Sequence, residues 1–179
     1  CGEKALKYNF IMEYNIHPII VHFPIAFLFL YSLIVILPVN RWFPSQSWLF
    51  VRILLLTLGF LGLLAATSSG EVAEDFTKGS HDVIEMHEAF ANASVWLYGL
   101  LLAGELLPFL ERKILRYIRS LAPLFTFLHN ILRNRIIIWV LALAGLGSLL
   151  LTGMLGGILV YGTTADPLAP LLLNILGIN

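Results

Sequence analysis

Residues 136–161 read IIIWVLALAGLGSLLLTGMLGGILVY and contain no charged side chain. About 20 residues of helix cross the apolar core of a bilayer, so this stretch is long enough to span one. Three further stretches meet the same criterion, at about 19–39, 48–67 and 89–110. In lipid, backbone polar groups must pair within the span, and no strand-like alternation is present. The sequence therefore predicts an all-α integral membrane protein, a four-transmembrane-helix bundle.

The composition supports the same class. Of 179 residues, 59% are hydrophobic and 12% are charged, and the mean hydropathy is +0.87. These values exclude an ordinary water-soluble domain and a disordered chain. The formal net charge is zero, so no basic surface for nucleic acid is indicated. A single cysteine excludes an internal disulfide and a cysteine-rich metal site.

The connections between the spans differ in charge. Basic side chains lie in or beside the first and third connections: Arg41, Arg52, Arg112, Lys113, Arg116, Arg119, Arg133 and Arg135. The second connection is acidic, with Glu71, Glu74, Asp75, Asp82, Glu85 and Glu88. Because basic loops stay in the cytoplasm, we expect the acidic connection and both termini outside. The expected organisation is an external tail (1–15), a membrane domain (16–163) and an external apolar segment (164–179).

Two apolar segments lie outside the spans. In the third connection, apolar residues recur at helical spacing: Ile114, Leu115, Ile118, Leu121 and Leu124 or Phe125. They predict a cytoplasmic amphipathic helix between the third and fourth spans, lying on the inner membrane surface, with Pro123 as its break. Residues 165–179 read ADPLAPLLLNILGIN and predict an interfacial or docking segment on the outer face.

Four of the five histidines fall at the expected outer end of the bundle, namely His17, His22, His81 and His87. Residues five or six apart diverge around a helix, so each helix can direct one histidine inward. On the predicted topology, His22 and His87 are the deeper members. Facing imidazoles in a helix bundle are typical of haem b. We expect His22 and His87 to bind the haem iron, with His17 or His81 as a substitute ligand or a partner of the propionates.

Small residues in the second and fourth spans offer flat space for a macrocycle: Gly59, Gly62, Ala65, Ala66, Gly145, Gly147, Gly153, Gly156 and Gly157. The same pattern is typical of close helix–helix packing, and histidines at helix ends also serve as structural hydrogen-bonding groups. A purely structural role for all four histidines therefore stays open.

A second kind of site is also open. His81, Glu85 and Glu88 lie on one helical stripe, and with His17 they form a donor set for a zinc, iron or copper ion. The acidic residues are otherwise a solvated face, or a docking patch for a basic partner such as a soluble cytochrome.

Other polar and aromatic residues have expected places near the membrane. Glu105 is a candidate proton-relay group, or it pairs with Arg112 or Arg52. His129 is expected at the inner interface. The aromatic residues Trp42, Trp48, Trp96, Tyr98 and Trp139 match interfacial belts.

Three motifs resemble a family of bacterial predicted membrane proteins, a four-helix domain of unknown function. HPIIVHFP at 17–24 is similar to its opening motif, SGEVAEDF…IEMHEAFANA at 69–93 to its acidic loop and following helix, and GMLGGILVYG at 153–162 to its closing motif. The matching motif positions are His17, His22, His87, Glu88, Gly156, Gly157 and Tyr161. Many relatives carry a histidine just after the closing motif, where this chain has Gly162, Thr163 and Thr164.

The resemblance implies a bacterial inner-membrane protein associated with respiratory components. The expected function is one-electron transfer by haem b between a periplasmic donor, such as a cytochrome, and a membrane redox complex or quinone. The alternative is a non-catalytic accessory subunit of a larger membrane assembly. In that case the glycine-rich faces and the apolar C-terminal segment form the contacts.

Overall fold

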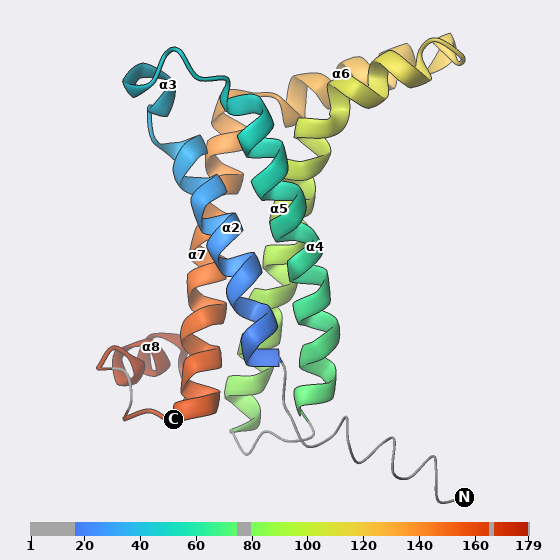
Figure 1. Ribbon diagram of the computed structural model, residues 1–179. Coiled ribbons are helices and arrows are strands. Elements are labelled where there is room, and N and C mark those ends of the chain that lie inside the picture. The colour runs from blue at the N-terminus through green and yellow to red at the C-terminus, as the bar shows by residue number, and fades with distance from the viewer. Residues whose placement is uncertain (1–16, 75–79, 165–166, 179) are drawn as a thin grey trace, which may run out of the picture.

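The computed structural model describes residues 17–74, 80–164 and 167–178, without the side chains of 71–74. The expected tail 1–15, Asp75 and the side chains of Glu71 and Glu74 lie outside this part. Four long helices form a bundle (Figure 1): α2 (His17–Ile36), α4 (Trp48–Glu74), α5 (His81–Ile114) and α7 (Arg135–Tyr161). All four are long and apolar enough to cross a membrane, and the described residues form no strand. The helical class is confirmed, and so is the presence of four helices long and apolar enough to cross a membrane.

The two ends of the bundle differ in character. The starts of α2 and α5 and the ends of α4 and α7 lie together at the lower end in Figure 1, which we call the histidine end. We call the opposite end, where α5 ends at Ile114 and α7 begins at Arg135, the arginine end. The described residues also form three short α-helices and one 3₁₀ helix: α3 (Val39–Trp42), η1 (Arg119–Leu121), α6 (Ala122–Leu132) and α8 (Ala169–Leu176).

The helices extend beyond the expected spans. α5 begins at His81 instead of 89, and α4 continues to Glu74 instead of ending near 67. Asp82 lies in the first turn of α5, where a carboxylate complements the positive end of the helix dipole. A hydropathy pattern marks the apolar core of a span, whereas a helix continues through polar residues as long as its backbone hydrogen bonds are made.

The predicted amphipathic helix takes a different form. The helical spacing at 114–125 is interrupted, because α5 ends at Ile114 and α6 begins only at Ala122. Pro123 occupies the first turn of α6 and does not break a helix. Proline is well tolerated there, because the backbone N–H that it lacks would have no helical partner.

The bundle consists of two equivalent helical hairpins. α2 packs most extensively on α4, and α5 packs most extensively on α7. The contacts of α2 with α7 and of α4 with α5 are less extensive and equal to each other in extent. Leu28 packs on Gly59 as Tyr98 packs on Gly145. The spacing from His17 to Leu28 equals that from His87 to Tyr98, so the two hairpins repeat the same arrangement.

The centre of the bundle is an apolar core that also contains polar groups. Its buried residues come from all four long helices: Leu28, Tyr31, Leu56, Leu63, Tyr98, Leu101, Ala142 and Leu149. The interfacial position expected for Tyr98 is wrong, because its side chain is fully buried and its hydroxyl lies 2.8 Å from that of Ser32. A tyrosine hydroxyl is tolerated in a core when it finds such a partner.

The C-terminal segment docks on its own bundle. Ala169 of α8 and Ile178 beyond it are buried in a cluster with Val83 of α5 and Leu155 and Ile158 of α7. The segment expected to be interfacial or docking thus packs on α5 and α7 of its own chain. Leu171 and Ile175 on its other side stay exposed.

Candidate cofactor site at the histidine end

His87 is held by the neighbouring helix of its own hairpin. Its Nδ1 lies 2.9 Å from the carbonyl oxygen of Thr152 on α7. A carbonyl only accepts, so Nδ1 carries the hydrogen, and the lone pair of the neutral ring is on Nε2. Gly156 lets the ring approach α7, since a Cβ at this position would lie 3.2 Å from Cε1 of His87.

His17 is held in the corresponding way by α4. Its Nδ1 lies 2.8 Å from the hydroxyl oxygen of Ser69, and that hydroxyl donates to the carbonyl oxygen of Ala66 over 3.0 Å. The Ser69 oxygen therefore accepts from Nδ1–H, which selects the same tautomer as in His87. A Cβ at Gly70 would lie 3.3 Å from Cε1 of His17. Both imidazoles thus rest on a glycine of the paired helix.

The two oriented imidazoles lie at the same end of the bundle. They come from α2 and α5, which occupy diagonal positions in the bundle. Both rings are partly buried. Two neutral imidazoles, each fixed through Nδ1, form a donor arrangement typical of metal-ligating histidines, whose second nitrogen is oriented by an oxygen acceptor.

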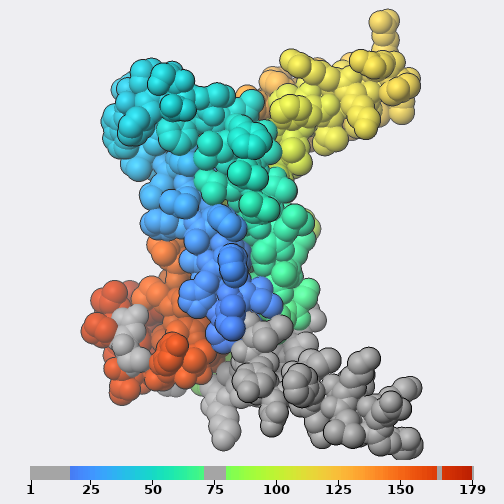
Figure 2. All heavy atoms as spheres, viewed as in Figure 1, coloured from blue at the N-terminus to red at the C-terminus, as the bar shows by residue number. Residues whose placement is uncertain are grey.

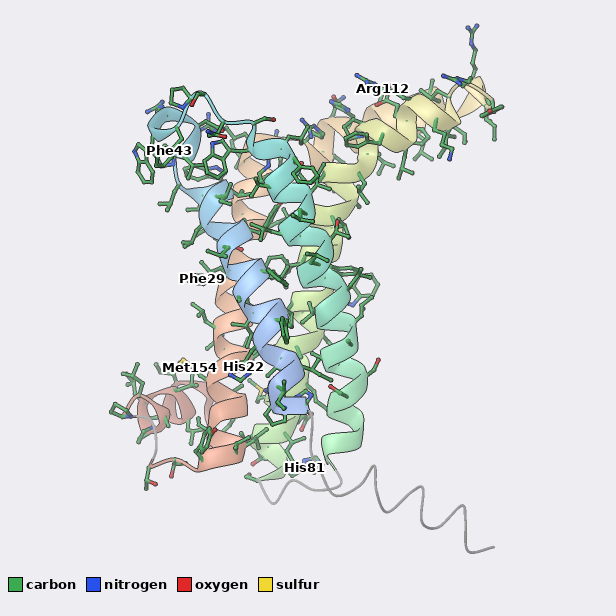
Figure 3. All side chains as sticks on the ribbon, in the orientation of Figure 1. His22, Phe29, Phe43, His81, Arg112 and Met154 are labelled. Atoms are coloured by element: carbon green, nitrogen blue, oxygen red, sulfur yellow. The ribbon has the colours of Figure 1, made fainter. Side chains whose placement is uncertain are left out.

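His22 does not join this pair. Its side chain is exposed, and its Nδ1 hydrogen-bonds to the carbonyl oxygen of Pro18 on its own helix. Figure 3 shows His22 at the level of Met154, above the end where His81 lies. The expectation that His22 faces inward opposite His87 is wrong. Residues five apart diverge by about 140° on a helix, and in this structure His17 is the member that faces α4.

The His–carboxylate alternative is not assembled. His81, Glu85 and Glu88 are exposed on α5. Within residues 17–74, 80–164 and 167–178, no three His, Cys, Asp or Glu side chains gather in a group able to hold a metal ion. His17 is directed to Ser69, so it does not complete that set. Side chains that share one helical stripe still need a facing helix to close a site.

The small residues serve three different purposes. Gly59, Gly62 and Gly145 admit Leu28, Pro24 and Tyr98, which is close helix packing. Gly156 admits an imidazole. Gly153 and Gly157 line an open groove of about 390 Å³ on the α2–α7 face, together with Ile25, Leu149, Leu150, Met154, Tyr161 and Gly162. The groove follows the half of α7 that ends at the histidine end, and its lining includes neither His17 nor His87.

A buried ion pair occupies the other half of the bundle. Arg52 of α4 lies 3.1 Å from the carboxylate of Glu105 on α5, and the Glu105 side chain is 5% exposed. Of the two partners expected for Glu105, the structure selects Arg52. His129 lies 3.6 Å from Glu111, which places it beside α5.

Several buried polar residues were not singled out from the sequence. Ser94 donates to Ser148 over 3.1 Å, and Ser148 donates to the carbonyl oxygen of Phe90 over 2.7 Å. Tyr31 and Ser32 are fully buried near the centre. A serine within an apolar stretch carries no sign of its partner. Only the spacing of four residues from Leu28 to Ser32 and from Ser94 to Tyr98 indicates that these serines face the core.

No family model, curated protein or solved structure matches the chain. The family resemblance therefore rests on the three sequence motifs alone.

Proposed function

We propose that the protein is a membrane b-type haem electron carrier, in which His17 and His87 would hold the haem iron. The observation that carries this proposal is that Thr152 and Ser69 select the same tautomer in both imidazoles, with the lone pair on Nε2. This assignment replaces His22 by His17 and keeps His87.

The residues at the histidine end fit such a group in their chemistry. A histidine that ligates iron is commonly oriented by an oxygen acceptor at its other nitrogen, which also raises its basicity. Gly70 and Gly156 let the rings approach the paired helices closely, since a Cβ would lie 3.3 Å from Cε1 of His17 and 3.2 Å from Cε1 of His87. When bound, haem would supply one-electron transfer, and the hydrogen bonds of His17 and His87 would tune its potential.

The protein residues have distinct tasks in this proposal. His17 and His87 would hold the iron from the two hairpins, Ser69 and Thr152 orient the imidazoles through Nδ1, and Gly70 and Gly156 admit the rings next to the paired helices. Because the ligands come from different hairpins, haem would also link the two halves of the bundle. Binding to the folded state alone would then raise stability with haem concentration.

The proposed setting is the bacterial inner membrane, with the histidine end and both termini on the periplasmic side. The distribution of basic residues favours this orientation, because basic segments remain in the cytoplasm. The electron donor would be a periplasmic protein such as a cytochrome, and the acceptor would be a membrane redox complex or a quinone. The exposed acidic residues Asp82, Glu85 and Glu88 at the start of α5 suit a basic donor.

The test is a reduced-minus-oxidised visible spectrum of the protein purified in mild detergent. We expect the sharp α-band of a b-type haem in the wild type and in His22→Ala and His81→Ala. His17→Ala and His87→Ala should lose the low-spin spectrum or the haem itself. A wild type that stays colourless with haem supplied would overturn the proposal. Loss of the band in His22→Ala but not in His17→Ala would overturn the ligand assignment.

A second candidate function is that of an accessory subunit in a larger membrane assembly. It is favoured by the α2–α7 groove, where a Cβ at Gly157 would meet no atom within 4 Å. Small residues that are not needed for internal packing suit close approach of another transmembrane helix. Gly157→Leu should then reduce co-purification of the assembly and leave the fold intact. Unchanged co-purification would count against this role.

A further inference from the structure

A helical arm extends from the arginine end of the bundle. We call the lateral arm the part of the chain from Pro108 to Leu132, which comprises the end of α5, η1 and α6. In Figures 1 and 2 it projects sideways from the four long helices. Pro108 lies inside α5, and a proline within a helix removes one backbone hydrogen bond and favours a bend.

The base of the arm is fixed to the bundle. At Gly104, α5 and α6 approach so closely that a Cβ would lie 2.9 Å from the carbonyl oxygen of Leu132. Further out, His129 lies 3.6 Å from Glu111, and Phe125 is buried. The two segments of the arm therefore hold each other, and the direction of the arm is set by packing.

One side of α6 is apolar and uncovered. Leu124, Phe127 and Ile131 are 50%, 60% and 37% exposed. Their spacing places them on one stripe of the helix. Thr126 and Asn130, which are also exposed, lie on the other side. At the tip of the arm, Tyr117 is 78% exposed. An apolar stripe next to a polar face is typical of a helix that lies in a membrane interface.

The arm and its flank are strongly cationic. Arg112, Lys113, Arg116, Arg119, Arg133 and Arg135 are all exposed. Glu111 is the one acidic residue between 106 and 135, and it is beside His129. Cations at the level where membrane-spanning helices end face the phosphate groups of the bilayer.

We propose that the lateral arm lies on the surface of an anionic phospholipid bilayer. The stripe of Leu124, Phe127 and Ile131 enters the boundary of the acyl chains, and the arginines bind lipid phosphates. The four spans fix the bundle across the same bilayer, so the arm needs no further anchor to reach the headgroups. This inference is independent of the proposed haem.

The first experiment tests which face of α6 meets lipid. An environment-sensitive fluorophore is attached to Phe127→Cys on the apolar stripe, or to Asn130→Cys on the polar side, in a Cys1→Ser background of the full chain in nanodiscs. Lipid-borne quenchers in the acyl region should quench the first probe strongly and the second weakly. Equal quenching at both positions would overturn the proposal. A shielded probe at 127 that lipid quenchers do not reach would show that protein covers the stripe, which also overturns it.

The second experiment tests the charge. The triple variant Arg112→Gln, Arg116→Gln, Arg119→Gln is compared with Arg41→Gln, an exposed cation of α3 at the same end. Native mass spectrometry measures the preference for bound phosphatidylglycerol relative to bound phosphatidylcholine, and quenching at position 127 is measured in the same variants. Each cation near an anionic surface contributes about a fivefold preference, so the triple variant should lose about a hundredfold. The control should lose no more than about fivefold. An unchanged preference in the triple variant would overturn the role of the arm in binding anionic lipid.

Discussion

The guanidinium of Arg52 on α4 and the carboxylate of Glu105 on α5 lie 3.1 Å apart inside the bundle. They join one helix of each hairpin, and Glu105 is buried. In lipid, an ionised side chain is tolerated when it faces the bundle interior and has a partner. The pair is therefore a link between the two hairpins at the half of the bundle opposite the histidines.

Replacing one member of this pair should destabilise the protein more than replacing both. Arg52→Met or Glu105→Gln leaves one buried charge or polar group uncompensated, at a loss of about 3–5 kcal/mol for the buried charge. The double variant should recover a large part of that loss. Unfolding by sodium dodecyl sulfate in mixed micelles measures each free energy. If the two single losses simply add in the double variant, the pair contributes no coupling.

Two glycines offer a matched test of close packing. A Cβ at Gly59 would lie 2.5 Å from Cδ2 of Leu28, whereas one at Gly157 would meet nothing within 4 Å. Gly59→Ala should lower the free energy of unfolding by about 1–3 kcal/mol, because the core is overpacked. Gly157→Ala should be neutral or slightly stabilising, since alanine is the better helix former. Similar losses in the two variants would contradict this difference in packing.

The two central tyrosines should respond differently to loss of their hydroxyls. Tyr98 shares a hydrogen bond of 2.8 Å with Ser32, whereas the Tyr31 hydroxyl has no hydrogen-bond partner among the described residues. Tyr98→Phe should cost about 0.6 kcal/mol, the average for such bonds between membrane helices. Tyr31→Phe should cost nothing measurable. A double-mutant cycle of Tyr98→Phe with Ser32→Ala checks that the loss belongs to this bond.

The hydroxyl of Ser69 should matter through His17. Ser69→Ala removes the hydroxyl oxygen that lies 2.8 Å from the His17 Nδ1, so the imidazole loses one of the contacts that orient it. Under the proposed function, haem affinity should fall by about 10- to 100-fold. Ser68→Ala is the control, because Ser68 is the exposed neighbour on the same helix. Haem titration followed by absorbance measures both, and equal affinities in the two variants would argue against an orienting role.

Much of the fold was predictable from the sequence. Apolar length identified the four membrane-spanning helices, because a backbone in lipid has no alternative to internal hydrogen bonds. The boundaries were less predictable. Helix α5 starts at His81 and includes polar residues that a hydropathy pattern assigns to a loop. The effect of Pro123 was also ambiguous from the sequence, because a proline breaks a helix when it lies in the interior but is well tolerated in the first turn.

The candidate site was predictable only in part. The sequence indicated that each of the first and third spans directs one histidine inward, and His87 was correctly assigned to that role. It did not determine whether His17 or His22 faces the bundle. Their spacing of five residues shows that the two side chains point in different directions, but it does not show which one faces a neighbouring helix. Ser69 and Thr152, which orient the rings, lie on other helices and carry no signal in the local sequence.

What the sequence by itself determined is the helical class, the presence of four helices long and apolar enough to cross a membrane, and the clustering of histidines at one end, because these follow from local hydropathy and chain order. What only the tertiary structure decided is the rotation of each helix about its own axis. That rotation pairs Arg52 with Glu105, turns Tyr98 into the core and sets His17 against Gly70. It depends on how side chains of distant segments fit together, and this fit is a property of helix pairs that no single stretch of sequence contains.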